Sequence, residues 1–182
     1  TASTTSGFTI TANSQYPGGY YGWYACDNNF TTEWAIDGNS FDTGILTVQM
    51  PEQYIVSKMA FAFRFISGVL EGWYNIALSG SNDGTTYTTI YSTVFSSAMT
   101  GIIELPVNNT TAYSYYRFTG TNKYTDNPGL AYFQLYQSNS SSSIYLSGTG
   151  PTGPTGYGVP TITTGDTLTF QTGSYITIDT IS

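Results

Sequence analysis

The sequence predicts an all-β protein, an antiparallel β-sandwich or jelly roll. Three observations lead to this class. Long helical periodicity is absent, short β-forming segments alternate with clusters of Gly, Asn, Asp and Pro, and aromatic residues make up 16% of the 182 residues, with 17 Tyr. Tyr and Thr favour the half-buried, pleated surface of a sheet. Seven or eight short strands separated by turn residues are typical of a sandwich.

Seven segments carry the strand pattern. In chain order they are residues 44–50, 57–65, 73–79, 86–91, 101–105, 115–119 and 130–136. The clearest alternation lies in 57–65. One face of that segment carries Met59, Phe61, Phe63 and Phe65, and the other carries Lys58, Ala60, Ala62 and Arg64. This period of two predicts a half-buried strand.

The composition changes after residue 137. Residues 138–158 read as a Ser-rich linker (NSSSS at 139–143) and a neck in which Gly150, Gly153 and Gly156 recur every third position. Collagen requires Gly at this spacing, but a Pro/Gly spacer explains two such triplets equally well. The tail, 159–182, alternates apolar and polar residues and predicts two short strands. Since a lone hairpin is marginal in water, we expect a homo-trimer through neck and tail.

The charge pattern excludes several function classes. Only 8% of the residues are charged, and the formal net charge is −7 with four Lys and Arg in all. Four basic residues that are scattered along the sequence do not form the cluster that binding to a nucleic-acid backbone requires. For the same reason, binding to an anionic membrane is not expected. No run of eighteen apolar residues exists, so membrane insertion is not expected. The chain begins without Met or signal peptide, which indicates a processed chain or a fragment.

The sequence gives little material for catalysis. It contains no His, which excludes His-based triads and His metal sites, and its single cysteine, Cys26, reads as a buried free thiol. Paired carboxylates remain formally possible, Glu33 with Asp27 or Glu71 with Asp83. Acids among turn residues are usually caps and turn formers. We therefore predict that the chain is not an enzyme.

Four segments together resemble one family. Residues 25–34 (ACDNNFTTEW) match the pattern A-x-D-G-N-x-x-T-x-W, with Asn28 in place of its glycine. Residues 78–87 (LSGSNDGTTY), 112–118 (AYSYYRF) and 129–136 (GLAYFQLY) are similar to a strand and turn, an arginine-containing strand and the closing strand of the same family. That family is the discoidin or coagulation-factor type C domains and related galactose-binding-like carbohydrate modules. The resemblance implies an eight-stranded jelly-roll sandwich over 1–137, with ligand-binding loops at one end.

The resemblance also implies a metal site. Many members of the family hold a structural calcium at the first motif, where Asp27, Asn29 and Thr32 offer oxygen ligands. The carboxylate that the family commonly adds from its closing strand is replaced here by Tyr132. The alternative is an Asx-type turn that its own backbone satisfies.

Three loops are the candidate binding site. They are 15–24 (QYPGGYYGWY), which precedes the first motif, 66–73 and 121–128. Sugars stack their C–H faces on aromatic rings and need a few fixed hydrogen-bonding groups. The residues that we expect to bind ligand are Tyr20, Tyr21, Trp23, Glu71, Trp73, Lys123, Tyr124 and Asn127. We expect Trp34 in the core, Trp23 and Trp73 exposed, and Arg117 paired within the scaffold.

These features favour a non-catalytic carbohydrate-binding attachment module of a virion, fibre or cell-surface protein, with glycans as partners. Low charge and many hydroxyl groups suit an extracellular or virion surface, and a trimer would gain avidity from weak sites. Two alternatives remain. One is a structural module whose aromatic loops dock onto neighbouring fibre or capsid proteins, and the other is an appendage of a carbohydrate-active enzyme.

Overall fold

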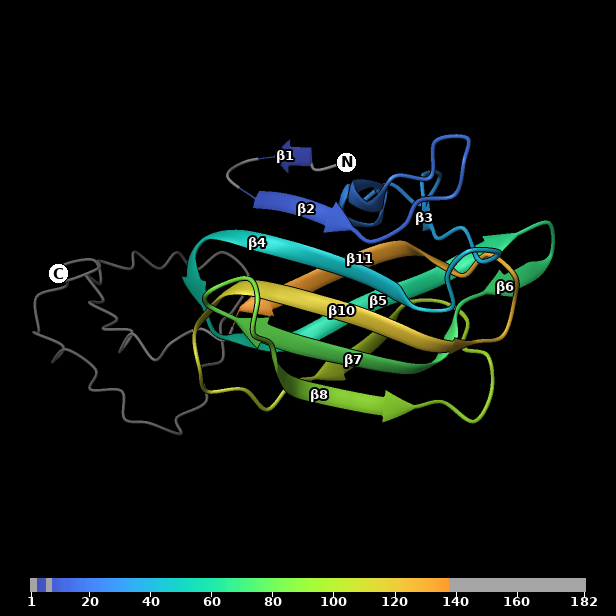
Figure 1. The fold of residues 1–182 in the computed structure, drawn as a ribbon. Coiled ribbons are helices and arrows are strands. Elements are labelled where there is room, and N and C mark those ends of the chain that lie inside the picture. Colours follow the sequence, from blue (N-terminus) through green and yellow to red (C-terminus); the bar gives the residue numbers. More distant parts are fainter. Residues whose placement is uncertain (1–2, 6–7, 138–182) are drawn as a thin grey trace, which may run out of the picture. The chain divides into compact units, whose positions relative to one another are not determined.

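The computed structural model describes residues 3–5 and 8–137. They belong to the first of the two units into which the chain divides, Thr1–Ser138. The predicted linker and neck (138–158), the β-rich tail (159–182) and the trimer inferred from them lie outside the described residues. The described part consists of two antiparallel sheets packed face to face (Figure 1).

The first sheet has six strands. In spatial order they are β1 (Ser3–Thr5), β2 (Phe8–Ala12), β4 (Gly44–Tyr54), β10 (Tyr113–Lys123), β7 (Trp73–Ser81) and β8 (Thr88–Val94). The second sheet runs β3 (Trp34–Ala35), β11 (Gly129–Gln137), β5 (Val56–Ile66) and β6 (Val69–Glu71), and β9 (Ile103–Pro106) also pairs with β5. A short 3-10 helix, η1 (Gly22–Cys26), precedes β3.

All seven predicted strands are present, as β4, β5, β7, β8, β9, β10 and β11. The segment 66–73 was predicted as a loop, and this is wrong because β6 lies within it. Ser67 and Gly68 both have positive φ, 51° and 82°, which is the backbone of a two-residue hairpin turn. The turn returns the chain onto β5, where Arg64 pairs with Glu71 and Phe65 with Leu70.

The prediction that β5 is half buried is wrong as well. Met59, Phe61 and Phe63 face the core as expected, but Ala60, Ala62 and Arg64 on the opposite face are also buried. Tyr132 and Tyr136 of β11 pack against the two alanines, so the outer face of the strand is covered by taller neighbours. Phe65, predicted inside, is 62% exposed because β5 runs beyond the sandwich core at this point and pairs there with β6.

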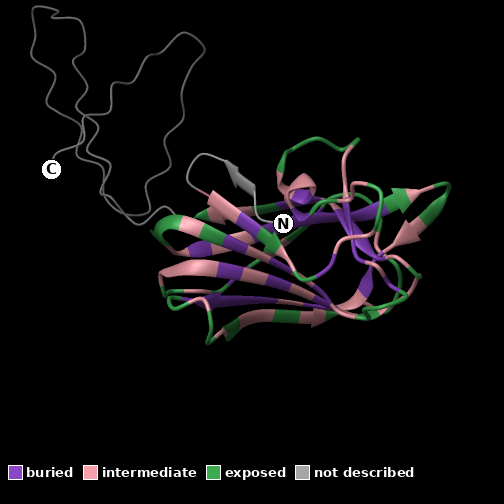
Figure 2. Ribbon diagram, turned by 45° about the horizontal axis from the view of Figure 1, so that its top comes forward, coloured by how far each residue is buried: buried purple, intermediate pink, exposed green. Residues whose placement is uncertain are grey.

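The core lies between the sheets, where buried positions alternate with half-buried ones along β4 and β10 (Figure 2). Trp34 is fully buried, as predicted, and its indole donates to the carbonyl of Ser14 at 2.9 Å. Trp73 is also fully buried, so its predicted exposure is wrong. It packs against Trp34, Phe63 and Phe118 with ring centroids 5.9 to 6.3 Å apart. A residue in this position cannot contact a ligand at the surface.

A pair of glycines explains the burial of Trp73. Gly44 on β4 lies directly opposite Gly120 on β10. A methyl group added to Gly44 would come within 2.2 Å of the Trp73 ring, and one added to Gly120 within 2.4 Å. The two missing side chains therefore leave the slot that the indole fills.

Among residues 3–5 and 8–137, none of the helical segments has the length and apolar character that a membrane-spanning helix needs.

Candidate functional site

Four segments that are distant in the sequence meet around Arg64, near the end of β5. Its Nε donates to Glu33 Oε1 at 2.6 Å, and its Nη1 donates to a carboxylate oxygen of Glu71. The same Nη1 lies 3.4 Å from the carbonyl oxygen of Asn127, to which it also donates. The guanidinium carbon lies 4.6 Å from the centre of the Tyr20 ring. We call these five residues the Arg64 cluster. Its members come from the loop before η1, the loop before β3, the β5–β6 hairpin and the connection from β10 to β11.

The Arg64 cluster is partly buried and carries more negative than positive charge. The side chains of Arg64, Glu33 and Glu71 are 5%, 18% and 14% exposed. Burial raises the pKa of Glu71, and although Arg64 opposes this shift, the charges of Glu33 and Asp126 add to it. Two carboxylates thus share one guanidinium, and the bonds between them hold both carboxylates in place.

The aromatic loop 15–24 only partly matches its predicted role. Gly18 and Gly19, with φ of 108° and 106°, turn the chain back on itself. Trp23 packs against the hydrophobic core and against Tyr24, with ring centroids 4.2 Å apart, and it is half-buried rather than exposed. Tyr21 lies parallel to Trp23 and is 40% exposed. Of the predicted aromatic residues in this loop, Tyr21 therefore offers the most free surface to a ligand.

The predicted residues of the third loop are engaged within the scaffold. Lys123 Nζ pairs with Asp42 at 2.9 Å and also donates to the carbonyl of Gly38. The Tyr124 ring packs edge-on against Phe63, and burial raises the pKa of its hydroxyl. This hydroxyl has no hydrogen-bond partner in the described part of the chain. Lys123 and Tyr124 therefore brace the loop, whereas Asn127, Tyr20 and Glu71 come together in the Arg64 cluster.

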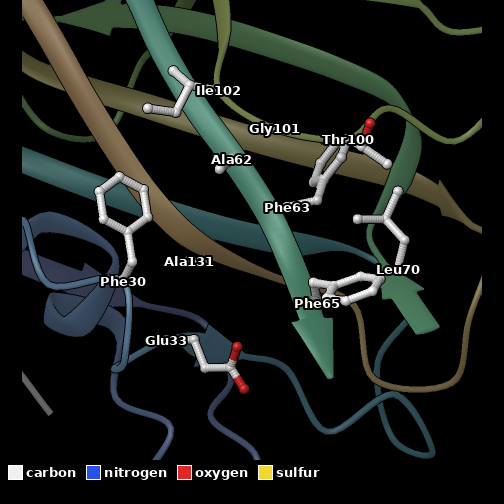
Figure 3. A pocket seen from close by; sticks show the side chains of 10 residues that line it. All are labelled: Phe30, Glu33, Ala62, Phe63, Phe65, Leu70, Thr100, Gly101, Ile102 and Ala131. Carbon is white, nitrogen blue, oxygen red and sulfur yellow. The ribbon is translucent and has the colours of Figure 1, made fainter. Parts of the chain in front are cut away.

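A surface hollow of about 460 Å³ adjoins the Arg64 cluster (Figure 3). It is lined by Phe30, Glu33, Ala62, Phe63, Phe65, Leu70, Thr100, Gly101, Ile102 and Ala131. We call it the Phe30 hollow. Ala62 and Ala131 contribute small side chains to its lining, and larger side chains stand beside them. Phe30, Phe65 and Ile102 are 56%, 62% and 52% exposed, so three of the large exposed apolar side chains in the described residues border one concave surface.

Glu33 connects the two features, because it lines the Phe30 hollow and also receives the bond from Arg64. Phe30 is held by the ring of Tyr132, which is nearly parallel to it at 5.3 Å. Phe30, Phe65 and Ile102 are not among the predicted binding residues, and Glu33 was predicted only as part of a possible carboxylate pair. Phe30 did carry a signal, since it is an aromatic residue within the polar stretch 28–33 (NNFTTE).

The three residues of the predicted calcium site lie close together but bond to one another. Asp27 accepts the backbone N–H of Asn29 at 2.9 Å and the hydroxyl of Thr32 at 2.7 Å, and Asn29 Oδ1 accepts from Thr31. Calcium takes six to eight oxygen ligands. The described residues contain no cluster of three or more His, Cys, Asp or Glu side chains that could hold a metal. The bonds within the loop form an Asx turn that uses the same oxygen atoms that a calcium ion would need.

Arg117 is paired within the scaffold, as predicted. The guanidinium of Arg117 lies 3.5 Å from the centre of the Tyr87 ring, and its Nε donates to Thr47 at 3.4 Å. Cys26 is a free thiol as predicted, but the residue is half-buried rather than fully buried, and the burial of its thiol still raises its pKa to about 12.

No protein-family model matches the chain, and a search of curated proteins finds no relative. Solved structures do match. Chitosan-binding module 1 of a chitosanase/glucanase from Paenibacillus sp. IK-5 is 24% identical, with a TM-score of 0.61, over 71% of this chain and 95% of that one. The family 32 carbohydrate-binding module of NanJ from C. perfringens, solved with galactose, is 18% identical, with a TM-score of 0.62, over 72% and 95%.

A third match is the module CpGH89CBM32-5 from Clostridium perfringens, solved with GalNAc-β-1,3-galactose. It is 19% identical, with a TM-score of 0.63, over 71% of this chain and 95% of that one. At these identities the likeness concerns the fold, and it confirms the expected discoidin-like architecture. The described part of the chain has the β-sandwich fold that family 32 carbohydrate-binding modules also have.

Proposed function

We propose that this chain is a non-catalytic glycan-binding module and that the glycan binds at the Phe30 hollow. The observation that carries the proposal is the hollow itself, with exposed Phe30 and Phe65 on its border and the carboxylate of Glu33 in its lining. Small-molecule sites are concave, roughly 300–1,000 Å³ in volume and mostly apolar, with a few polar groups that orient the ligand. A sugar ring provides an apolar C–H face for the phenylalanines and hydroxyl donors for the carboxylate.

The charges and the structural neighbours support a glycan over other ligands. All four cations of the chain already have partners. Lys58 pairs with Glu104, Arg64 with two glutamates, Lys123 with Asp42, and Arg117 lies on the Tyr87 ring. A nucleic-acid backbone would find no free basic patch among them. Neighbours of the same fold are described as binding chitosan and as complexes with galactose.

The proposal leaves no residue in a catalytic role. Glu33 and Glu71 are both committed to Arg64, so neither carboxylate is free to act as an acid or a base. This function is also compatible with the module being an appendage of a larger enzyme, as the Paenibacillus neighbours are.

The setting that we propose is an extracellular or virion surface, where the module attaches a fibre, virion or cell-surface protein to glycans. The support comes from the low charge of the sequence and from the Gly-Pro-Thr repeat, and the proposed homo-trimer rests on the same segments. Light scattering on the full chain tests the trimer. The proposed calcium at Asp27, Asn29 and Thr32 is tested by metal analysis and by thermal unfolding with and without a chelator.

A glycan array with the full chain, followed by titrations, tests the proposed function. We expect Phe30→Ala and Phe65→Ala each to weaken binding at least tenfold, because each removes one stacking face, while thermal unfolding changes little. Phe41→Ala is the matched control, since Phe41 is 43% exposed but does not line the hollow, and it should bind like wild type.

Two outcomes would contradict the glycan proposal. The first is that no glycan on the array binds, and the second is that both phenylalanine variants bind as tightly as wild type. The alternative, docking of the exposed apolar side chains onto a neighbouring fibre or capsid protein, predicts the first outcome. It also predicts that these variants lose a protein contact instead.

A further inference from the structure

The Phe30 hollow offers few hydrogen-bonding groups. Of the ten residues that line it, Glu33 and Thr100 alone have polar side-chain atoms, and the other side chains are apolar, apart from Gly101. Hydroxyl groups that lose water without gaining a partner weaken binding. A plain hexose carries hydroxyls around its whole rim, so its ring can stack against the border but gains little by entering. The group that fills the hollow should be mainly apolar, with one donor or two.

The charge near the hollow restricts the ligand further. Glu33 and Glu71 together carry two negative charges against the one of Arg64, and Asp126 adds to the negative field at Glu71. Arg64 donates to Oε1 of Glu33. Because the two oxygens of a carboxylate accept several hydrogen bonds, Glu33 can accept a further one from a ligand. The hollow therefore favours an N–H or O–H donor and disfavours a carboxylate or sulfate group on the ligand.

We propose that the Phe30 hollow takes the acetamido group of a neutral N-acetylated amino sugar. The methyl group would lie among Phe30, Phe65 and Ile102, and the amide N–H would donate to Glu33. The sugar ring would then stack its C–H face on Phe30, whose ring also stacks on that of Tyr132. This inference rests on the proposed glycan-binding function and names the class of sugar at that same site.

The free amine is the closest competitor of the acetamido group. A protonated amine would be attracted to Glu33, but it is strongly hydrated, and the apolar lining replaces almost none of that water. The acetyl group removes the charge, keeps one N–H donor and adds a methyl group, which gains from leaving water. The substituent on the second ring carbon should therefore decide affinity in the order acetamido, amine, hydroxyl.

Three matched methyl glycosides test this order on the full chain, those of N-acetylglucosamine, glucosamine and glucose, together with the corresponding galactose series. Monosaccharides keep the comparison free of avidity. Titration calorimetry should show, in at least one series, that the acetamido sugar binds at least tenfold tighter than both counterparts. In saturation-transfer NMR its acetyl methyl should receive more saturation than the ring protons, because it lies deepest among the apolar side chains.

Variants locate the effect and separate the two proposals. Phe30→Ala and Phe65→Ala should abolish the preference for the acetamido sugar, and Phe41→Ala should retain it. If amine or hydroxyl sugars bind as tightly as the acetamido sugar through Phe30, this inference is wrong while the glycan-binding function stands. If acetamido sugars bind but both phenylalanine variants keep the preference, the hollow is not the acetamido site. If no sugar binds here or on the array, the proposed function fails and this inference fails with it.

Discussion

Arg64 shows how strongly a single residue depends on its surroundings. By the alternation of β5 it faces away from the core, where an arginine is normally solvated, yet it is 4% exposed. It is tolerated there because Glu33, Glu71 and the Asn127 carbonyl receive its donors, and Tyr20 covers its guanidinium. A buried guanidinium in this position mainly holds other groups in place. It fixes Glu33, which is the one charged side chain in the lining of the Phe30 hollow.

Arg64→Met should lower the free energy of unfolding by about 3 kcal/mol at pH 7, because it leaves two neighbouring carboxylates without their cation. Urea unfolding measures the loss. It should shrink at pH 4.5, because burial raises the pKa of Glu71 and protonation of this carboxyl group removes one of the two uncompensated charges. Arg117→Met is the control, and the loss of its contact with Tyr87 should cost about 1 kcal/mol with no such pH dependence. A loss for Arg64→Met that is equal at both pH values would contradict this explanation.

At the scale of elements, the pairing of β4 with β10 decides what β7 can bury. The register places Gly44 opposite Gly120, and the Trp73 indole at the start of β7 fills the space between them. Phe118 of β10 packs against both Trp73 and Phe61. Because of these two glycines, Trp73 belongs to the core, although the sequence predicts it as an exposed residue of a binding loop.

Gly120→Ala tests this slot. The new methyl group would overlap the Trp73 ring, so we expect a loss of roughly 1–3 kcal/mol in the free energy of unfolding. Trp73→Phe provides a smaller ring, and the double variant should be more stable than the sum of the two single losses predicts, by about 0.5–3 kcal/mol. Ser92→Ala on the exposed edge strand β8 is the control. Purely additive losses in urea unfolding would show that the methyl group and the indole do not meet.

At the scale of the whole molecule, the fold keeps several acidic groups neutral. Burial raises the pKa of Cys26 from 9.0 to about 12 and that of Tyr132 from 10.0 to about 12. Below pH 9 both groups are protonated in the folded and in the unfolded chain, so they do not change the free energy of unfolding with pH. Above it the unfolded chain releases their protons while the folded chain retains them, so stability is lost as the pH rises from about 9 to 12.

Thermal unfolding measured from pH 7.5 to 10.5 should therefore show a fall that begins near pH 9. Cys26→Ala should remove the first part of this fall, because Cys26 has the lower pKa in the unfolded chain, and Tyr132→Phe should leave that part intact. If Cys26→Ala follows the wild-type curve between pH 8.5 and 10, the thiol is more accessible to solvent than its place in the structure indicates.

The extent of sequence-based prediction differs between the fold and the site. The strands were predictable because alternation and turn residues are local, and Trp34 was placed correctly by its position in a motif. Only some of the residues predicted for the site lie near the hollow that we propose. Tyr20, Glu71 and Asn127 meet around Arg64, but Trp73, Lys123 and Tyr124 are engaged in the scaffold, and Phe30 and Phe65 take their place at the surface.

The sequence by itself determined the all-β class, the positions of seven strands and the lack of any basic patch or histidine chemistry, since composition and period-two patterns act within a few neighbouring residues. Tertiary structure alone decided which aromatic residues meet solvent. Periodicity tells the two faces of a strand apart, but what covers each face comes from distant segments. Phe30 and Phe65 border one hollow because a loop and a strand end meet there, and Trp73 is buried because two glycines pair across a sheet.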